Sequence, residues 1–107
     1  MIARAFSITA ALALCACTTL SVAPPISPAL VAAGGGHSPA VLAIGRELFT
    51  GRCTACHTAD PPAKYTIGEW REIVGDMAHR AKLSVEQQSA LLSYIAASRE
   101  IAPSVEN

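Results

Sequence analysis

This chain has no excess of either positive or negative charge, and it has few aromatic side chains and few methionines. Eight Lys and Arg residues balance eight Asp and Glu residues, aromatic residues make up 5% of the sequence, and only two methionines occur. A chain without a basic stripe gives no indication of nucleic-acid binding. Its neutrality also provides little long-range steering toward a charged partner, so any docking must rely on local patches.

Alternation of apolar and polar residues, the pattern of a half-buried strand, is missing as well, and helical spacing takes its place. Ser38 and Pro39 begin one helix as its N-cap and first residue. Apolar residues then recur at helical spacing as far as Phe49, and Gly51 ends the helix. The sequence therefore predicts an all-α protein.

Two capping boxes, each a hydroxyl residue followed three positions later by Glu or Gln, predict the next helices. Thr66 with Glu69 opens one helix, and Ser84 with Gln87 opens another that ends before Pro103. One face of the helix that follows Thr66 is apolar and carries Trp70, Ile73, Val74 and Met77.

Residues 1–16 are typical of a secretion signal, because a lone positive charge at Arg4 precedes an apolar run too short to span a bilayer. The run ends in Leu14-Cys15-Ala16-Cys17, which resembles a bacterial lipobox and predicts Cys17 as the lipid-modified first residue of the mature protein. The alternative is an ordinary signal cleaved further on, after Val31-Ala32-Ala33. Under either reading the chain is exported, and we expect a periplasmic protein anchored to the membrane as a lipoprotein.

The rest of the chain divides by composition. Residues 17–37 are rich in Pro, Gly and Ala, which predicts a disordered linker. The folded domain is expected over residues 38–102, and residues 103–107 form a C-terminal tail. A hydrophobic core of this size gives only marginal stability unless a covalent cross-link or a cofactor adds to it.

Cys53-Thr54-Ala55-Cys56-His57 is the most specific pattern in the sequence. The C-x-x-C-H spacing is the attachment signature of a c-type haem, because two thiols can add to the two haem vinyl groups and the adjacent imidazole can bind the iron. We therefore expect one covalent haem c, held by Cys53 and Cys56. A thiol–disulfide pair would need a preceding strand, and a zinc site would need a further ligand pair. The sequence offers neither.

At this point the chain resembles the monohaem c-type cytochromes of class I, in a compact bacterial form, over most of residues 38–98. The resemblance rests on the haem motif and on Gly45, Phe49, Met77, Leu91 and Tyr94. It implies a small cytochrome c-like domain of three to four helices around one covalent haem. In such a domain the first and last helices cross closely, a small Gly allows the approach, and an aromatic pair packs at the crossing.

The resemblance also implies the axial ligands of the iron, with His57 as the proximal ligand. Met77 is the expected distal ligand, since Met1 belongs to the signal and no other thioether is present. Met77 lies on a predicted helix, whereas many members of the family carry this ligand in an extended loop. His79 is the rival ligand, but it points about 200° away from Met77 around the helix.

Haem propionates need polar partners, and Trp70 and Arg71 are the candidate haem contacts on the helix that carries Met77. Other candidate partners for the propionates are Arg52, Lys64, Tyr65, Arg80 and Lys82.

With both axial sites filled, such a protein carries single electrons and is not an enzyme. We expect a carrier in a periplasmic or membrane-associated redox chain, with a dehydrogenase, reductase or oxidase as its partner. The alternative is a gas-binding or peroxidase-like haem protein, which requires an open or displaceable sixth site.

Overall fold

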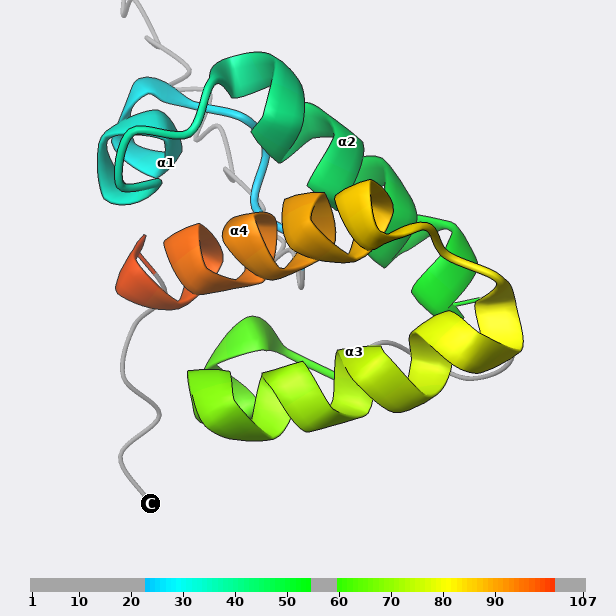
Figure 1. The fold of residues 1–107 in the computed structure, drawn as a ribbon. Helices are drawn as coiled ribbons and strands as arrows, with labels where there is room; N and C mark the ends of the chain where they lie inside the picture. The colour runs from blue at the N-terminus through cyan, green and yellow to red at the C-terminus, as the bar shows by residue number, and fades with distance from the viewer. Residues whose placement is uncertain (1–22, 55–59, 102–107) are drawn as a thin grey trace, which may run out of the picture.

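The computed structural model describes residues 23–54 and 60–101, which fold into helices (Figure 1). The elements are α1 (Pro28–Ala33), α2 (Pro39–Thr50), the 3-10 helices η1 (Arg52–Thr54) and η2 (Pro62–Lys64), α3 (Ile67–Ala81) and α4 (Val85–Ile101). No strand occurs in these two stretches, and the all-α class is confirmed for them.

The helices begin where the capping residues predict. Ser38 Oγ accepts a hydrogen bond from the Val41 amide at the start of α2, at 3.2 Å. At the start of α3 the capping box is complete, with the Thr66 amide bonded to Glu69 at 2.9 Å and the Glu69 amide bonded to the Thr66 hydroxyl at 3.2 Å. Ser84 and Gln87 make the same reciprocal pair before α4. Each pair satisfies two amides that a helix N-terminus would otherwise leave unpaired.

Helices α2 and α4 cross at Gly45, and their contact forms the centre of the fold (Figure 1). A Cβ atom on Gly45 would overlap the carbonyl oxygen of Ala90 and lie 2.6 Å from the Tyr94 Cβ. The rings of Phe49 and Tyr94 pack beside the crossing, with centroids 5.8 Å apart. The predicted close crossing of these helices is therefore confirmed, together with its small residue and its aromatic pair.

Helix α3 is joined to this crossing through aromatic side chains. The Trp70 ring lies 6.3 Å from Phe49 and 5.3 Å from Tyr65, centroid to centroid, in edge-to-face geometries. Such pairs contribute about 0.5–1.5 kcal/mol beyond the area that they bury. Trp70, Val74 and Ala78 form the buried stripe of α3.

Residues 23–37 differ from the prediction of a disordered linker, which is wrong for this stretch. Ser27 caps α1 through its hydroxyl, Leu30 has no exposed surface, and Ala23 is buried as well. The helix α1 packs against α4, a contact that composition does not reveal. The folded domain therefore includes residues 23–37 and does not begin at residue 38.

Several predictions from the sequence concern residues that the structure does not describe. The signal at residues 1–16, the lipidation site Cys17, residue 102 and the tail at 103–107 lie outside the described residues. Among the helices of the described stretches, none has the length and apolar character needed to cross a membrane.

The Gly45 contact gives a direct test of the crossing. Gly45→Ala should lower the free energy of unfolding by about 1–3 kcal/mol, because the new methyl group meets the backbone of Ala90. Gly75→Ala is the matched control, since nothing lies within 4 Å of a Cβ at that position in α3. The control should raise the free energy of unfolding by about 0.5–1 kcal/mol. Denaturant midpoints measure both effects, and equal shifts of one sign would contradict the crossing.

Candidate functional site

Cys53, the first thiol of the C-x-x-C-H motif, lies in η1 directly after α2 and is 8% exposed. Burial raises the pKa of its thiol, because removal from water penalises the thiolate. The side chain borders a cavity of about 270 Å³ whose other lining residues are Phe49, Asp60, Tyr65, Trp70, Ile73, Asp76 and Met77. An apolar and aromatic lining with a few polar groups is typical of a cofactor site.

Met77 shares this cavity with Cys53. It lies two turns after Trp70 on α3 and is half-buried, with Ile73 between them on the same face. His79 is exposed and does not line the cavity. Val74 was expected on the Met77 face, but it is buried in the core and is absent from the cavity lining. The face of α3 that borders the cavity is therefore shifted from its apolar stripe, away from Val74 and toward Asp76.

The structure separates the two predicted haem contacts on α3. Trp70 borders the cavity, whereas Arg71 is exposed and lines a different hollow between α3 and α4, together with His37 and Leu92. Cys56 and His57 lie outside the described residues. The structure thus brings together Cys53, Trp70 and Met77 but leaves Arg71 apart from them.

Hydrogen bonds connect residues 60–65, which follow the motif, to one another and to α3. Asp60 accepts from Lys64 Nζ at 2.7 Å and from the Tyr65 hydroxyl at 3.2 Å. The Trp70 indole N–H donates to the Pro62 carbonyl at 2.8 Å in a buried bond. Hydrogen bonding to Asp60 raises the pKa of Lys64. The donors of Tyr65 and Trp70, expected to serve haem propionates, therefore have partners within the protein.

Arg52 makes a further connection that the sequence did not reveal. Its guanidinium donates to the Ala81 carbonyl at 2.7 Å, at the C-terminal end of α3. A cation is favoured there by the helix dipole and by the unpaired carbonyls. The bond ties the residue before Cys53 to the last residue of the helix that carries Met77.

The described walls of this cavity offer a thiol and a thioether but no cluster of metal-binding side chains. Across residues 23–54 and 60–101, no group of three or more His, Cys, Asp or Glu side chains is placed to hold a metal ion. A haem iron would need only one protein ligand from this part of the chain, because the porphyrin supplies four nitrogens. Met77 offers a soft thioether sulfur, and Cys53 offers a thiol at the same cavity.

Comparison with known proteins gives no further guide to the class. No protein-family model, no curated protein and no solved structure matches this chain. The functional interpretation therefore depends on the motif and on the cavity beside it.

The hydrogen bond from the Trp70 indole to the Pro62 carbonyl should contribute more to the free energy of unfolding than the other polar bonds at this site. Trp70→Phe should lower the free energy of unfolding by at least about 1–3 kcal/mol, because it leaves a buried carbonyl without its donor. Tyr65→Phe removes a bond that is only partly buried, and it should cost about 1 kcal/mol or less. Denaturant titration of the two variants compares the costs. A larger loss for Tyr65→Phe would show that the indole bond does not anchor the segment.

Proposed function

We propose that this protein is an exported monohaem c-type cytochrome that carries single electrons and is not an enzyme. The observation that carries the proposal is the placement of Cys53 and Met77 at one apolar cavity. These residues are separated in sequence and were selected for different reasons, one as an attachment thiol and the other as the available thioether. Their shared cavity supports a small cytochrome c-like fold around a haem.

In this proposal Cys53 and Cys56 hold the haem through thioether bonds, with His57 and Met77 as the axial ligands. When bound, the haem supplies a one-electron iron couple. Thioether ligation raises the reduction potential relative to two histidines. Phe49, Trp70 and Ile73 exclude water from one side of the cavity, which favours the reduced and less charged iron.

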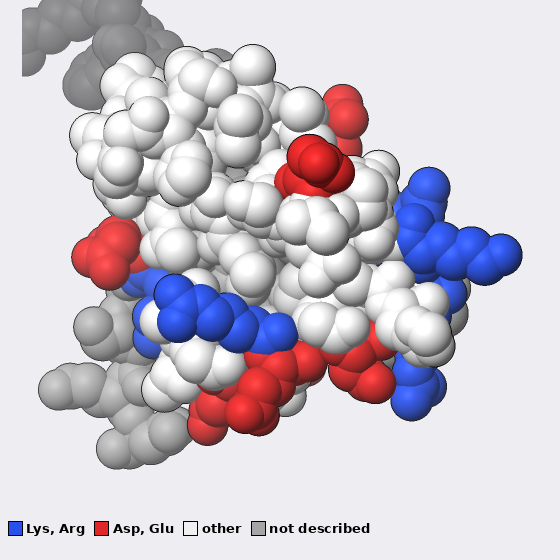
Figure 2. Space-filling model, in the orientation of Figure 1, with Lys and Arg blue, Asp and Glu red and all other residues white. Residues whose placement is uncertain are grey.

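The charge distribution supports docking by local contacts. In Figure 2 Lys and Arg lie beside Asp and Glu along the lower edge, while the area above them is mostly uncharged and carries a few acidic side chains. The exposed charges of α3 include both signs: Glu69, Arg71, Glu72, Asp76 and Arg80. A redox partner, whether a dehydrogenase, reductase or oxidase, would gain little from long-range attraction to this surface.

Export is part of the proposal, because covalent haem attachment in bacteria takes place outside the cytoplasm. Between the two processing routes, burial of Ala23 and Leu30 supports cleavage before Cys17. Cleavage after Ala33 would remove α1 and expose the surface of α4 against which it packs. The proposed location is the periplasmic face of the membrane, with Cys17 as the lipidated residue.

Attachment of the haem is tested on the protein exported by cells that have a haem-attachment system. A pyridine haemochrome spectrum should report one haem per chain, and acid–acetone extraction should leave the colour with the protein. Cys53→Ser should retain at most one thioether bond, which shifts the pyridine haemochrome band. Complete extraction of the haem from the unsubstituted protein would reject covalent attachment.

Ligation by Met77 is tested by removing its sulfur. Met77→Ala should abolish the weak near-infrared band expected for sulfur bound to ferric iron, convert the iron toward high spin and allow fast carbon monoxide binding. The matched control is His79→Ala, which should leave the spectrum unchanged because His79 is exposed and outside the cavity lining. The reverse pattern would indicate two histidine ligands. Fast carbon monoxide binding by the unsubstituted protein would favour the gas-binding or peroxidase-like alternative.

A further inference from the structure

The first described residues of the chain are held by their backbone carbonyls at the α2–α4 crossing. Arg46 of α2 donates through Nε to the Pro24 carbonyl at 3.1 Å and through Nη2 to the Ala23 carbonyl at 3.3 Å. Tyr94 of α4 donates its hydroxyl to the same Pro24 carbonyl at 2.7 Å. Side chains from both crossing helices therefore fix one point of the N-terminal segment.

The segment is held again along α1. Leu30 is fully buried in the same core cluster as Leu42 and Leu91. Close packing continues at Gly34, where a Cβ atom would lie 3.0 Å from Leu42 Cδ1. These contacts make α1 part of the core.

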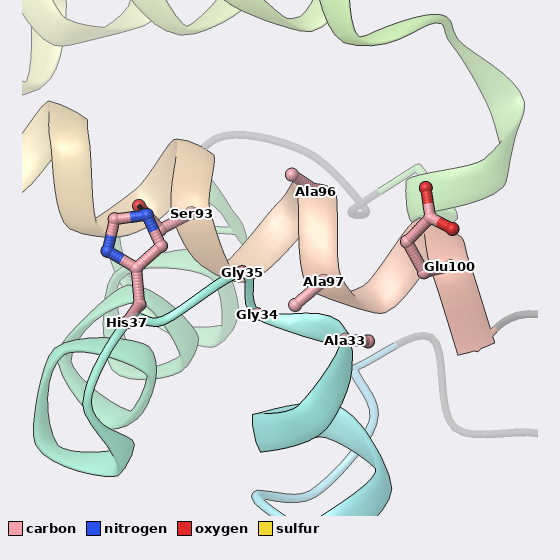
Figure 3. Close-up of a pocket in the computed structure, with 8 residues that line it drawn as sticks. All are labelled: Ala33, Gly34, Gly35, His37, Ser93, Ala96, Ala97 and Glu100. Atoms are coloured by element: carbon pink, nitrogen blue, oxygen red, sulfur yellow. Dashed lines mark hydrogen bonds between the residues drawn. The ribbon is translucent and has the colours of Figure 1, made fainter.

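A third attachment lies after α1, beside a surface hollow of about 480 Å³. Figure 3 shows His37, from the loop between α1 and α2, facing Ser93 of α4, with Glu100 at the far end of the hollow. The His37 Nε2 and Ser93 Oγ atoms are 3.2 Å apart, within hydrogen-bond distance. We call residues 23–37, attached in these three places, the clasp.

The Tyr94 bond persists over the ordinary pH range. Burial raises the pKa of the Tyr94 hydroxyl, so it remains a proton donor at neutral pH. The Pro24 carbonyl thus has a neutral donor in Tyr94 and a charged donor in Arg46, and hydrogen bonds to charged groups are the stronger kind.

From these contacts we infer that the clasp shortens the free tether and so confines the anchored domain to the membrane surface, where it would meet its electron-transfer partner. This inference rests on the proposed lipidation of Cys17. The chain from Cys17 to Ala23 can span at most about 20 Å, whereas a chain free as far as Ser38 could span about 70 Å. Electron transfer by the anchored domain would therefore take place within about 20 Å of the anchor point.

Neutron reflectometry on a supported phosphatidylcholine bilayer tests the confinement with the lipidated holoprotein. The protein layer should lie directly against the headgroups. The double variant Arg46→Gln/Tyr94→Phe removes the carbonyl bonds and keeps the aromatic ring. It frees the chain only as far as α1, which stays packed through Leu30, so its layer should be slightly thicker than the native one. An insert of roughly twelve Gly and Ser residues after Ser21 should extend the layer further. Glu72→Gln, on an exposed residue of α3 that lines none of the hollows described above, should leave the layer unchanged.

A native layer as thick as that of the insertion variant would overturn the inference, and so would an insertion variant with the native profile. The inference would also be overturned if Cys17 of the native protein carried no acyl chains, because the domain would then have no membrane anchor. Haem content, measured on the same sample, reports separately on the proposed cytochrome function.

Hydrogen exchange tests the clasp itself without requiring the lipid. The Leu30 and Val31 amides donate to Ser27, at 3.2 and 3.0 Å respectively. They should be protected in the native protein and exchange about tenfold faster in the double variant. The amides of α4 around Leu91 serve as the internal control for an intact fold. Native exchange of Leu30 at the rate of an open chain would show that the clasp does not form.

Discussion

The close approach of α2 and α4 at Gly45 is the constraint on which the other contacts depend. Because no side chain separates the helices there, Phe49 and Tyr94 come into ring contact one turn further along. The same approach brings Arg46 and Tyr94 to one backbone carbonyl at Pro24. It also fixes the end of α2, and with it the starting position of Cys53. A larger residue at position 45 would displace the aromatic cluster and the Cys53 side chain together.

The sequence predicted those features that depend on residues close together in the chain. Ser38, the Thr66–Glu69 box and the Ser84–Gln87 box set helix starts through bonds that span three residues, so spacing alone identifies them. The crossing at Gly45 joins distant segments, and it was predicted through the resemblance to a family. The shared cavity of Cys53 and Met77 agrees with the ligand assignment, although the assignment itself remains a proposal.

The missed features depend on backbone acceptors or on distant apolar partners. Residues 23–37 have the composition of a linker, yet Leu30 is buried through packing of α1 against α4. The bond from Arg52 to the Ala81 carbonyl has no sequence signature, because any residue supplies a carbonyl. Arg71 was placed near the haem by its position next to Trp70. A step of about 100° per residue around the helix instead directs it to another face.

Burial of Cys53 also affects the reactivity of its thiol. The thiolate is the form that attacks a disulfide, and a buried thiol with a raised pKa is seldom in that form. Folding of α2 and η1 around Cys53 therefore lowers the fraction of this thiol that is ready to attack a disulfide. The core that positions this side chain therefore also makes its thiol less reactive.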